Sequence, residues 1–594
     1  MSESPSAVSP SLREISTSEL ETILADHKEW LRSDGVTGER AAFDRVRLNG
    51  FEFSGADLRR TSFAGSDLTG AKFDSADLSG ANLAAANLTG ASLRAANLHG
   101  ADLDETILRD ADLRDADLLE ARGLSGGQLG GADVSGAKLP EAIMKFEGLA
   151  NVQETSKSSA SLFTSTLLLC AYTWLTILAT RDAQLLNNAA PPSSRLPILG
   201  TDIPLIQFYL VCPLLLFCFY LYFHLGLQRL WEELADLPAV FPDGRPLDAK
   251  AHPWMLNSLV CLHVERLRRA RPALTLWQAR LAAMVAWGIV PFTLVLIWAR
   301  YLTGHDWRVT GTHVVLIASA VGSGLGFYHL AIETLRGADR PSFSWRRPWQ
   351  DIRLIYGFVA LCAFVMLYVT SVGAIDGVNT RLVQKEISVD FQKRTLLDPR
   401  VWVPQSLDRV GIRSFAALDG IDLSIKPANW SGKETDLSVV KGADLAARDL
   451  RFADAYGAFF VNAFMKGADL RGADLREADF RNADLRLADL TGANLRGAKL
   501  QNADLHGAKL SHAVLTHANL SNADLARTDL SDARITEADL TGADLTNADL
   551  QRADLTGSKL IKATLVAVKM RDAKLDGTDL TGAKLAVPVE TSGK

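Results

Sequence analysis

Cysteine is scarce in this sequence, with five residues in a chain of 594. A fold held together by disulfides would need more. Four of the five, Cys170, Cys212, Cys218 and Cys362, lie inside long apolar runs, where cysteine acts as a small hydrophobic side chain. The fifth, Cys261, stands alone. The sequence therefore excludes a disulfide framework.

The sequence also lacks a large excess of either charge and the common catalytic motifs. It has 63 Lys and Arg against 69 Asp and Glu, a formal net charge of −6. A nucleic-acid-binding domain usually carries a basic stripe, so we expect no nucleic-acid partner. No CxxC, HExxH, GxSxG, GxxxxGK[ST] or GxGxxG pattern stands in a usable context. We therefore predict no catalytic residue, no metal ligand and no cofactor, and expect a protein that is not an enzyme.

Residues 1–20 are polar and rich in serine, with no apolar core, so we expect no cleavable signal peptide. At 594 residues the chain is about four times the usual length of one domain, and several domains are expected.

A period of five residues is the most prominent pattern that is present. A large apolar residue returns at every fifth position from Phe43 to Leu118, and after a one-residue insertion the period resumes at Leu124. A second array runs from Leu445 to Leu585. A small residue, mostly Ala, stands two positions before each central residue, Asp or Asn stands one before it, and Gly is frequent two after it.

This period favours short strands over helix. Five residues advance an α-helix by about 500°, so the leucines would form no continuous face. In a strand, the central residue and the residue two before it point the same way, and the Asx between them points outward. Ordering one repeat costs about 5–10 kcal/mol of backbone entropy, whereas burying one Leu stabilises by about 1.5–3 kcal/mol. Stability must therefore come from stacking the coils into a solenoid.

The stretches ADLSGANLAAANLTGASL and GADLRGADLREADF resemble the A(D/N)LXX pattern of the pentapeptide-repeat family. The resemblance covers residues 41–140 and 441–587, about 40% of the chain. It implies two right-handed quadrilateral β-helices with four repeats in each coil.

Some members of that family are soluble proteins that imitate duplex DNA and shield type II topoisomerases, which requires a strongly acidic rod. Residues 441–594 hold 21 Lys and Arg against 22 Asp and Glu, and residues 41–140 hold 10 against 15. A DNA-mimicking, topoisomerase-protecting protein is thus an alternative that the charge balance of the larger array does not favour.

Both ends of a solenoid need cover, because exposed strand edges invite aggregation. Residues 18–32 are predicted to form an amphipathic capping helix, with Ser18 and Glu21 as a capping box. After Leu585 only the stretch AVPVETSGK follows. That end is covered either by this tail or by a second copy, so a homodimer through the C-terminal solenoid end is a further possibility.

Five long runs between the arrays contain no Asp, Glu, Lys or Arg, at residues 158–180, 203–228, 281–299, 309–332 and 354–375. Each is close to or above the roughly 20 residues that cross a bilayer as a helix. The alternative is a set of buried helices in a soluble domain. We expect two pentapeptide-repeat β-helices flanking an α-helical transmembrane domain of about five helices.

The Lys and Arg residues suggest an orientation. Loop 229–280 carries eight and loop 333–353 carries five, whereas loops 181–202 and 300–308 carry two each. The positive-inside rule places the basic loops in the cytoplasm of a bacterial cell. Five crossings of the inner membrane then put the first solenoid inside and the second outside. Residues 376–400, with five Lys and Arg, conflict with this orientation, and a re-entrant fourth run, rich in Gly, would return both solenoids to one side.

The domain boundaries expected from these patterns are a tail and capping helix at 1–40, the first solenoid at 41–145, a transmembrane domain at 146–376 with a cytoplasmic loop at 229–280, a linker or cap at 377–440, the second solenoid at 441–587 and a tail at 588–594. His224 and His313 lie inside the spans, and we expect them at an interface or in the core. An ionisable residue deep in a span would indicate a transport path, so a transporter or channel with regulatory solenoids is the second hypothesis.

Candidate partner-binding residues lie in the second array. If a coil holds four repeats, an outward column of carboxylates stacks at Asp484, Asp504, Asp524 and Asp544. Such a stripe could collect a basic partner, and an ordinary solvated face is the simpler interpretation.

Aromatic residues mark the start of the same array. Phe459 and Phe464 replace the usual Asx near Tyr456, either as a docking patch or because the irregular segment 387–440, with Trp402 and Trp430, covers them. The expected function is a non-enzymatic integral membrane protein whose solenoids bind or scaffold an unknown protein partner, with membrane lipid around its helices.

Overall fold

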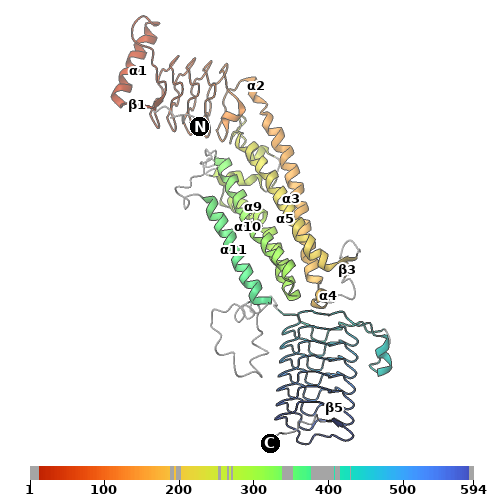
Figure 1. Cartoon of the computed structure of the whole chain (residues 1–594). Helices are drawn as coiled ribbons and strands as arrows, with labels where there is room; N and C mark the ends of the chain where they lie inside the picture. Colours follow the sequence, from red (N-terminus) through yellow and green to blue (C-terminus); the bar gives the residue numbers. More distant parts are fainter. Residues whose placement is uncertain are drawn as a thin grey trace, which may run out of the picture. The chain divides into compact units, whose positions relative to one another are not determined.

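The computed structural model describes residues 12–186, 193–195, 202–251, 254, 256–263, 267–268, 272–336, 352–375, 407, 415–427 and 430–586 (Figure 1). The chain forms two compact units. The first unit comprises Met1–Leu168, Cys218–Ile289 and Gly322–Tyr356, and the second comprises Leu169–Phe217, Val290–Val321 and Gly357–Lys594. Each unit contains one solenoid and parts of the long helices.

The hydrogen bonds of one repeat explain why each position keeps its residue type. In the repeat centred on Leu88, the amides of Leu88 and Gly90 donate to carbonyls 19 residues further along the chain, while the amide of Asn87 donates to the preceding coil. The amide of Ala86 closes a turn within its own coil. The amide of Thr89 donates instead to Oδ1 of Asn87, at 3.1 Å. The Asx side chain therefore satisfies the one amide that no neighbouring strand reaches.

The corner of each repeat explains the glycines. The residue two after each centre has a positive φ, such as 67° at Gly90 and 62° at Arg60. Glycine adopts this left-handed region without strain, whereas other residues do so less readily. The period of five in the sequence thus reflects one Asx turn and one left-handed corner per repeat.

Four repeats make one coil. Outward residues pair in parallel with residues 20 positions later, from Ala42 with Ser62 onward in the first solenoid and as far as Lys559 with Asp579 in the second. After the one-residue insertion the interval becomes 21, as between Asp117 and Lys138. Central residues and the alanines two before them fill the interior.

Helix α1 (Thr17–Arg32) covers the start of the first solenoid, and β1 (Arg13–Glu14) pairs in parallel with β2 (Val46–Arg47). The N-cap of α1 is Ser16, whose Oγ accepts from the amide of Glu19. The predicted capping box at Ser18 was therefore wrong. His27 lies fully buried on the solenoid side of α1.

The other end of the first solenoid is completed by a distant part of the chain. Gly131, Val134 and Gly136 donate to carbonyls of Leu237, Val240 and Pro242. Helices α2 (Glu141–Met144) and α6 (Leu247–Lys250) follow nearby in this unit. Residues 237–247 of the predicted loop 229–280 therefore belong to the solenoid, which corrects the expected domain boundary.

Within the described residues, five helices are long and apolar enough to cross a membrane. They are α3 (Glu147–Ala179), α5 (Leu205–Ala235), α9 (Ala273–Tyr301), α10 (Trp307–Arg336) and α11 (Ile352–Ile375). Pro213 and Pro291 lie inside α5 and α9. Helix α10 contains the fourth apolar run and is continuous through its glycines, so the alternative that this run is re-entrant was wrong.

Shorter elements connect these helices. They are α4 (Asp182–Leu186), the antiparallel pair β3 (Ser193–Arg195) and β4 (Asp202–Pro204), α7 (Val260–His263) and the short turn of 3₁₀ helix at Leu302–Gly304. Leu186 of α4 is buried in the apolar interior of the second solenoid.

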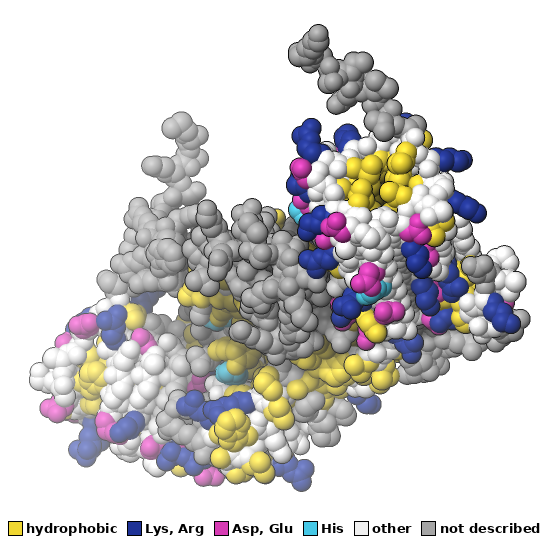
Figure 2. All heavy atoms as spheres, turned by 90° about the horizontal axis from the view of Figure 1, so that it is seen from below, with side chains coloured by type: hydrophobic (Ala, Val, Ile, Leu, Met, Phe, Trp, Pro, Cys, Tyr) yellow, Lys and Arg dark blue, Asp and Glu magenta, His cyan; other side chains and the backbone are white. Residues whose placement is uncertain are grey.

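The second solenoid begins earlier than predicted. Ala417 pairs with Asp454, and Asp422 pairs with Phe459, so residues 416–424 supply part of its first coil. This corrects the expected boundary at residue 441. At the far end, β5 (Thr564–Val566) pairs with β6 (Lys584–Ala586). There Leu575, Leu580 and Leu585 are exposed, and hydrophobic side chains ringed by charged ones are visible at this end in Figure 2.

Candidate functional site at the first coils of the second solenoid

The second solenoid has four sides, which we name by their outward columns. Side A contains Asp444, Phe464 and the four predicted aspartates, and side B contains Asp449, Asp469 and Asp489. Side C begins with Asp454, Asp474 and Asn494, and side D begins with Phe459, Asp479 and Lys499. Consecutive repeats lie on consecutive sides, so A lies opposite C and B lies opposite D.

The structure separates the three predicted aromatic residues. Phe464 lies on side A and is 56% exposed, directly before Asp484 in its column. Tyr456 is 45% exposed and follows Asp454 on the opposite side C, where the Arg476 guanidinium stacks over its ring. The three do not form one docking patch.

Phe459 is only 4% exposed, so of the two alternatives for this residue the structure favours coverage over a docking patch. The Trp430 ring meets it edge-on at 5.1 Å between ring centroids, and the Lys426 ammonium lies 4.5 Å from its centroid. Arg481 also donates to the carbonyl of Gly432. Within segment 425–440, the described residues 425–427 and 430–440 therefore cover the start of side D, as the simpler interpretation proposed. Trp402 lies outside the described residues.

The four aspartates of side A stack in register, as Asp484 with Asp504, Asp504 with Asp524 and Asp524 with Asp544. Each uses Oδ1 to accept the amide two residues later, at 2.9–3.2 Å. Their first role is thus the Asx turn. The second carboxylate oxygen of Asp484 accepts from Nη2 of Arg486 at 2.6 Å, and Nε of Arg486 lies 3.5 Å from Oδ2 of Asp504. Hydrogen bonding from Arg486 holds the pKa of Asp484 below its ordinary value.

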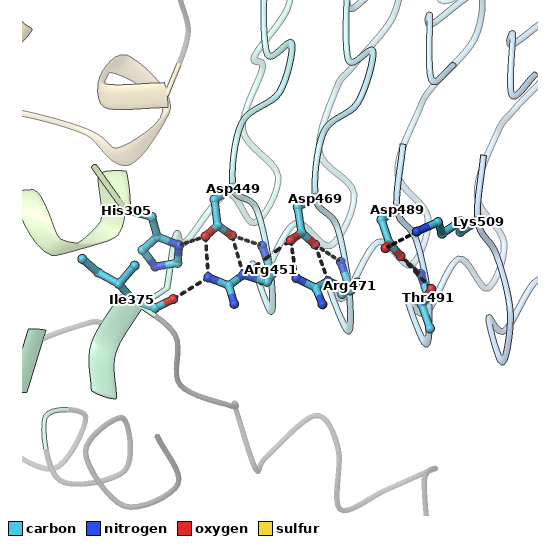
Figure 3. Close-up of polar contacts among 9 residues, drawn as sticks. All are labelled: His305, Ile375, Asp449, Arg451, Asp469, Arg471, Asp489, Thr491 and Lys509. Atoms are coloured by element: carbon cyan, nitrogen blue, oxygen red, sulfur yellow. Dashed lines mark hydrogen bonds and ion pairs between the residues drawn. The ribbon is translucent and has the colours of Figure 1, made fainter. Parts of the chain in front are cut away.

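Side B carries the most elaborate polar contacts of the second unit (Figure 3). His305, just after α9, lies 3.1 Å from Oδ2 of Asp449 through Nδ1. Arg451 holds the same carboxylate with Nε and Nη2, and its Nη2 also donates to the carbonyl of Ile375, the last residue of α11, at 2.7 Å. A guanidinium at the C-terminus of a helix complements the helix dipole.

Burial alone would raise the pKa of Asp449, but hydrogen bonds from His305 and Arg451 outweigh it and hold that pKa far below its ordinary value. The pKa of Arg451 is raised by its hydrogen bonds to Asp449. The carboxylate therefore stays charged at neutral pH and connects two helix ends to the first coil.

A second contact lies at the same end of the solenoid. Arg300, near the end of α9, donates to Oδ1 of Asp182 and to the carbonyl of Thr180, at 2.5 and 2.6 Å. Asp182 uses Oδ2 to accept the amide of Ala417 at 2.8 Å. The side chain of Asp182 is buried, so this ion pair is shielded from salt and water. We call the two contacts together the junction.

Beyond the junction, side B continues as a ladder of paired charges. Arg451 also approaches Asp469 at 3.6 Å, Arg471 holds Asp469 in a bidentate pair, and Lys509 approaches Asp489 at 3.7 Å. Because these charges are paired with one another, the start of side B offers little free charge to a partner.

The sequence reasoning missed the junction residues His305, Asp182, Arg300 and Arg451. The pairing of Arg451 could have been predicted from the sequence. An Arg that stands two residues after the outward Asp of a repeat forms a bidentate pair with that Asp, as Arg59 does with Asp57. The residues 416–424 also fit the pentad pattern, in the stretch AALDGIDLS. Nothing periodic marks His305 or Asp182, whose roles depend on residues far away in the chain.

Comparison with known proteins agrees with this architecture. The family model of pentapeptide repeats matches in eight copies, at residues 39–80, 81–118, 449–486, 488–525, 508–547 and 548–585. Among curated proteins, none matches the chain significantly.

Solved structures that match are themselves pentapeptide-repeat proteins. HetL from the cyanobacterium Nostoc sp. strain PCC 7120, involved in heterocyst differentiation regulation, is 31% identical over 29% of this chain and 85% of its own, with a TM-score of 0.13. A protein of the Arabidopsis thaliana thylakoid lumen is 34% identical over 18% and 68%, with a TM-score of 0.11. The fluoroquinolone resistance protein QnrB1 is 24% identical over 23% and 77%, with a TM-score of 0.17.

Proposed function

Since this chain is a pentapeptide-repeat protein whose two arrays flank five long apolar helices, we propose that it is a membrane-anchored scaffold that binds a protein partner on its second solenoid. In this proposal both solenoids are right-handed quadrilateral β-helices. The role is binding and not catalysis.

The helices support the membrane anchor. Large apolar side chains face outward along them, including Leu178 at 82% and Met366 at 73% exposure. Such side chains on a soluble protein would form an unusually large exposed apolar surface, whereas lipid covers them at no cost. We place the protein in the bacterial inner membrane, with the first solenoid in the cytoplasm and the second outside.

The observation that carries the binding role is side A, which none of the described residues 415–427 and 430–440 is seen to cover. Contacts at the first coils occupy side B, through the junction, and side D, through segment 425–440. On side A, the exposed Phe464 is followed by four stacked aspartates whose side chains become more exposed down the column, at 21% for Asp484 and 46% for Asp524. This surface suits a partner with an apolar anchor beside basic residues.

The test is site-specific photo-crosslinking of the full-length protein in its native membrane. A photoreactive phenylalanine analogue replaces Phe464, and the matched control places it at Tyr456 on the opposite side. We expect a discrete protein adduct from position 464 and none of that mass from position 456.

The aspartates are tested in the same assay. Changing Asp484, Asp504, Asp524 and Asp544 to Asn keeps the acceptor of each Asx turn and removes four charges. We expect this variant to lose at least about nine-tenths of the adduct, as four lost charge pairs of about 0.4 kcal/mol each would predict. The control changes Asp489, Asp529 and Asp549 on side B to Asn. Equal adducts from both sides, or an adduct that ignores the charges of side A, would refute the proposed interface.

A further inference from the structure

One histidine of the first unit lies in an aromatic enclosure inside a candidate membrane span. His224 is in the second half of α5 and is 1% exposed. Tyr220 meets its ring edge-on at 4.4 Å between centroids, Trp287 of α9 lies at 5.0 Å, and Phe327 of α10 stacks on it at 5.4 Å. Phe223 completes the enclosure at 5.2 Å.

Both ring nitrogens of His224 lack a hydrogen-bond partner among the described residues. A neutral imidazole has one donor and one acceptor, so the protein leaves both unsatisfied. A phenylalanine or leucine would fill an aromatic enclosure without this loss of hydrogen bonds. An ionisable residue in such a place indicates a function when a partner for it can be named.

Further unsatisfied polar atoms surround it. Nε1 of Trp287 and Oε1 of Gln228 are buried and have no partner within the described ranges. Gln228 follows His224 by four residues and therefore lies one turn further along the same face of α5. Trp287 supplies a donor on a ring that packs against the imidazole, and Gln228 supplies an acceptor one helical turn away. A donor and an acceptor are the set that a small hydrogen-bonding molecule such as water needs.

The same face of α5 leads to solvent. The side-chain amide of Gln228 donates to Oε1 of Glu232 at 3.2 Å and to Oγ1 of Thr334 at 2.9 Å. Glu232 is exposed. The spacing of four residues from His224 to Gln228 to Glu232 thus connects a buried base with an exposed carboxylate in two helical turns.

The ionisable groups around the row formed by His224, Gln228 and Glu232 come from four helices. On α5, Arg229 pairs with Glu233, and Tyr220 donates its hydroxyl to the carbonyl of Trp287. On α10, His329 pairs with Glu333, and Tyr328 packs on Trp287. His263 of α7 lies against Tyr328, and Tyr356 of α11 lies against His329. Carboxylates outnumber cations among these groups, which favours the approach of a proton.

We propose that His224, Trp287 and Gln228 form a hydrated proton-binding site that is reached from Glu232. A water held by Trp287 and Gln228 satisfies the imidazole. A proton from a hydronium ion in bulk water is relayed through Glu232 and this water to the nitrogen lone pair of His224. Each O–H bond that breaks along the relay is replaced by another, so the net change is one O–H bond of the hydronium ion broken and one N–H bond of His224 formed. The site adds a proton-responsive element to the helices that the scaffold role does not require.

Fluorescence of Trp287 tests the site in the full-length protein in lipid nanodiscs, because an imidazolium close to an indole quenches its emission. The emission of the Trp287→Phe variant is subtracted from that of the wild type, which isolates Trp287 from the other tryptophans. We expect this difference to fall at least about twofold as the pH is lowered from 8 to 4.5, along a single titration curve.

His224→Gln in both backgrounds should make the difference independent of pH, and Glu232→Gln should move the midpoint to lower pH. Glu154→Gln, an exposed change on α3, is the matched control and should leave the midpoint unchanged. A wild-type difference that stays constant over this range, or a titration that survives His224→Gln, would overturn the proposal. A midpoint that responds equally to the two glutamate changes would overturn the route through Glu232.

Discussion

At the scale of single residues, each repeat depends on one hydrogen bond that strand pairing does not provide. Asp and Asn at the outward position accept the amide two residues later, so their acidity and their structural role coincide. Because the fold itself needs these side chains, the Asp column of side A is by itself only weak evidence of a binding surface. Asn removes the charge of Asp and keeps the Asx turn, so Asp-to-Asn changes test the charge alone.

His27 gives a pH dependence at this scale. Its Nδ1 accepts the amide of Ala41 at 3.2 Å, and its Nε2 lies 3.1 Å from Oγ1 of Thr61. Burial lowers the pKa of His27 from its ordinary value of 6.5, so the unfolded state binds the proton more tightly than the folded state. The contribution of the neutral His27 ring to folding stability is complete above the ordinary pKa of 6.5 and is lost as the pH falls below that value.

We therefore expect α1 to open more readily at pH 5.5 than at pH 7.5. Hydrogen exchange of residues 17–32, corrected for intrinsic rates, should show several-fold faster opening at the lower pH. His27→Gln, which retains both a donor and an acceptor, should remove most of that difference. Unchanged pH dependence in this variant would show that another group is responsible.

At the scale of elements, the solenoid ends are covered by segments from elsewhere in the chain. Residues 237–247 complete the first solenoid, and α4 and residues 416–424 cover the start of the second. The junction adds charge-assisted hydrogen bonds to the ends of α9 and α11. The second solenoid is thus held to its helices by paired charges, which are directional, as well as by apolar packing.

The junction predicts a difference between two similar changes on side B. Asp449→Asn keeps the Asx turn but leaves Arg451 and His305 without their carboxylate, and should destabilise the second unit by about 1–3 kcal/mol. Asp489→Asn, where Lys509 is exposed, should change stability by less than about 1 kcal/mol. Thermal unfolding of the solubilised protein, followed by circular dichroism, compares them. Equal effects would mean that the junction contributes nothing beyond an ordinary surface pair.

At the scale of the whole molecule, our proposal puts five membrane crossings between the two arrays. Residues 237–247 are hydrogen-bonded into the first solenoid, so this part of the loop between α5 and α9 shares its side of the membrane. That loop is one of the two basic ones, and our proposal therefore puts it and the first solenoid in the cytoplasm by the positive-inside rule. The homodimer through the C-terminal end stays a prediction.

Labelling with a membrane-impermeant maleimide checks this topology. In a background with all five cysteines replaced, His99→Cys places a thiol on the first solenoid and His512→Cys places one on the second, both at exposed positions. In intact spheroplasts we expect labelling at position 512 and labelling at position 99 only after lysis. Labelling of both only after lysis would place both solenoids in the cytoplasm.

The sequence by itself determined the repeats, the buried column and the five apolar helices, because each depends on neighbours within a few residues or on the length of an apolar run. It predicted the helix that caps the start of the first solenoid, but neither the junction nor the roles of residues 237–247 and 416–424 at the other solenoid ends. His305 and Asp449 are 144 positions apart, and Gly131 and Leu237 are 106 apart, so no local pattern marks them. Only the tertiary structure decided that Phe459 is buried and Phe464 is exposed, because their local sequence is alike and the covering segment lies outside the period.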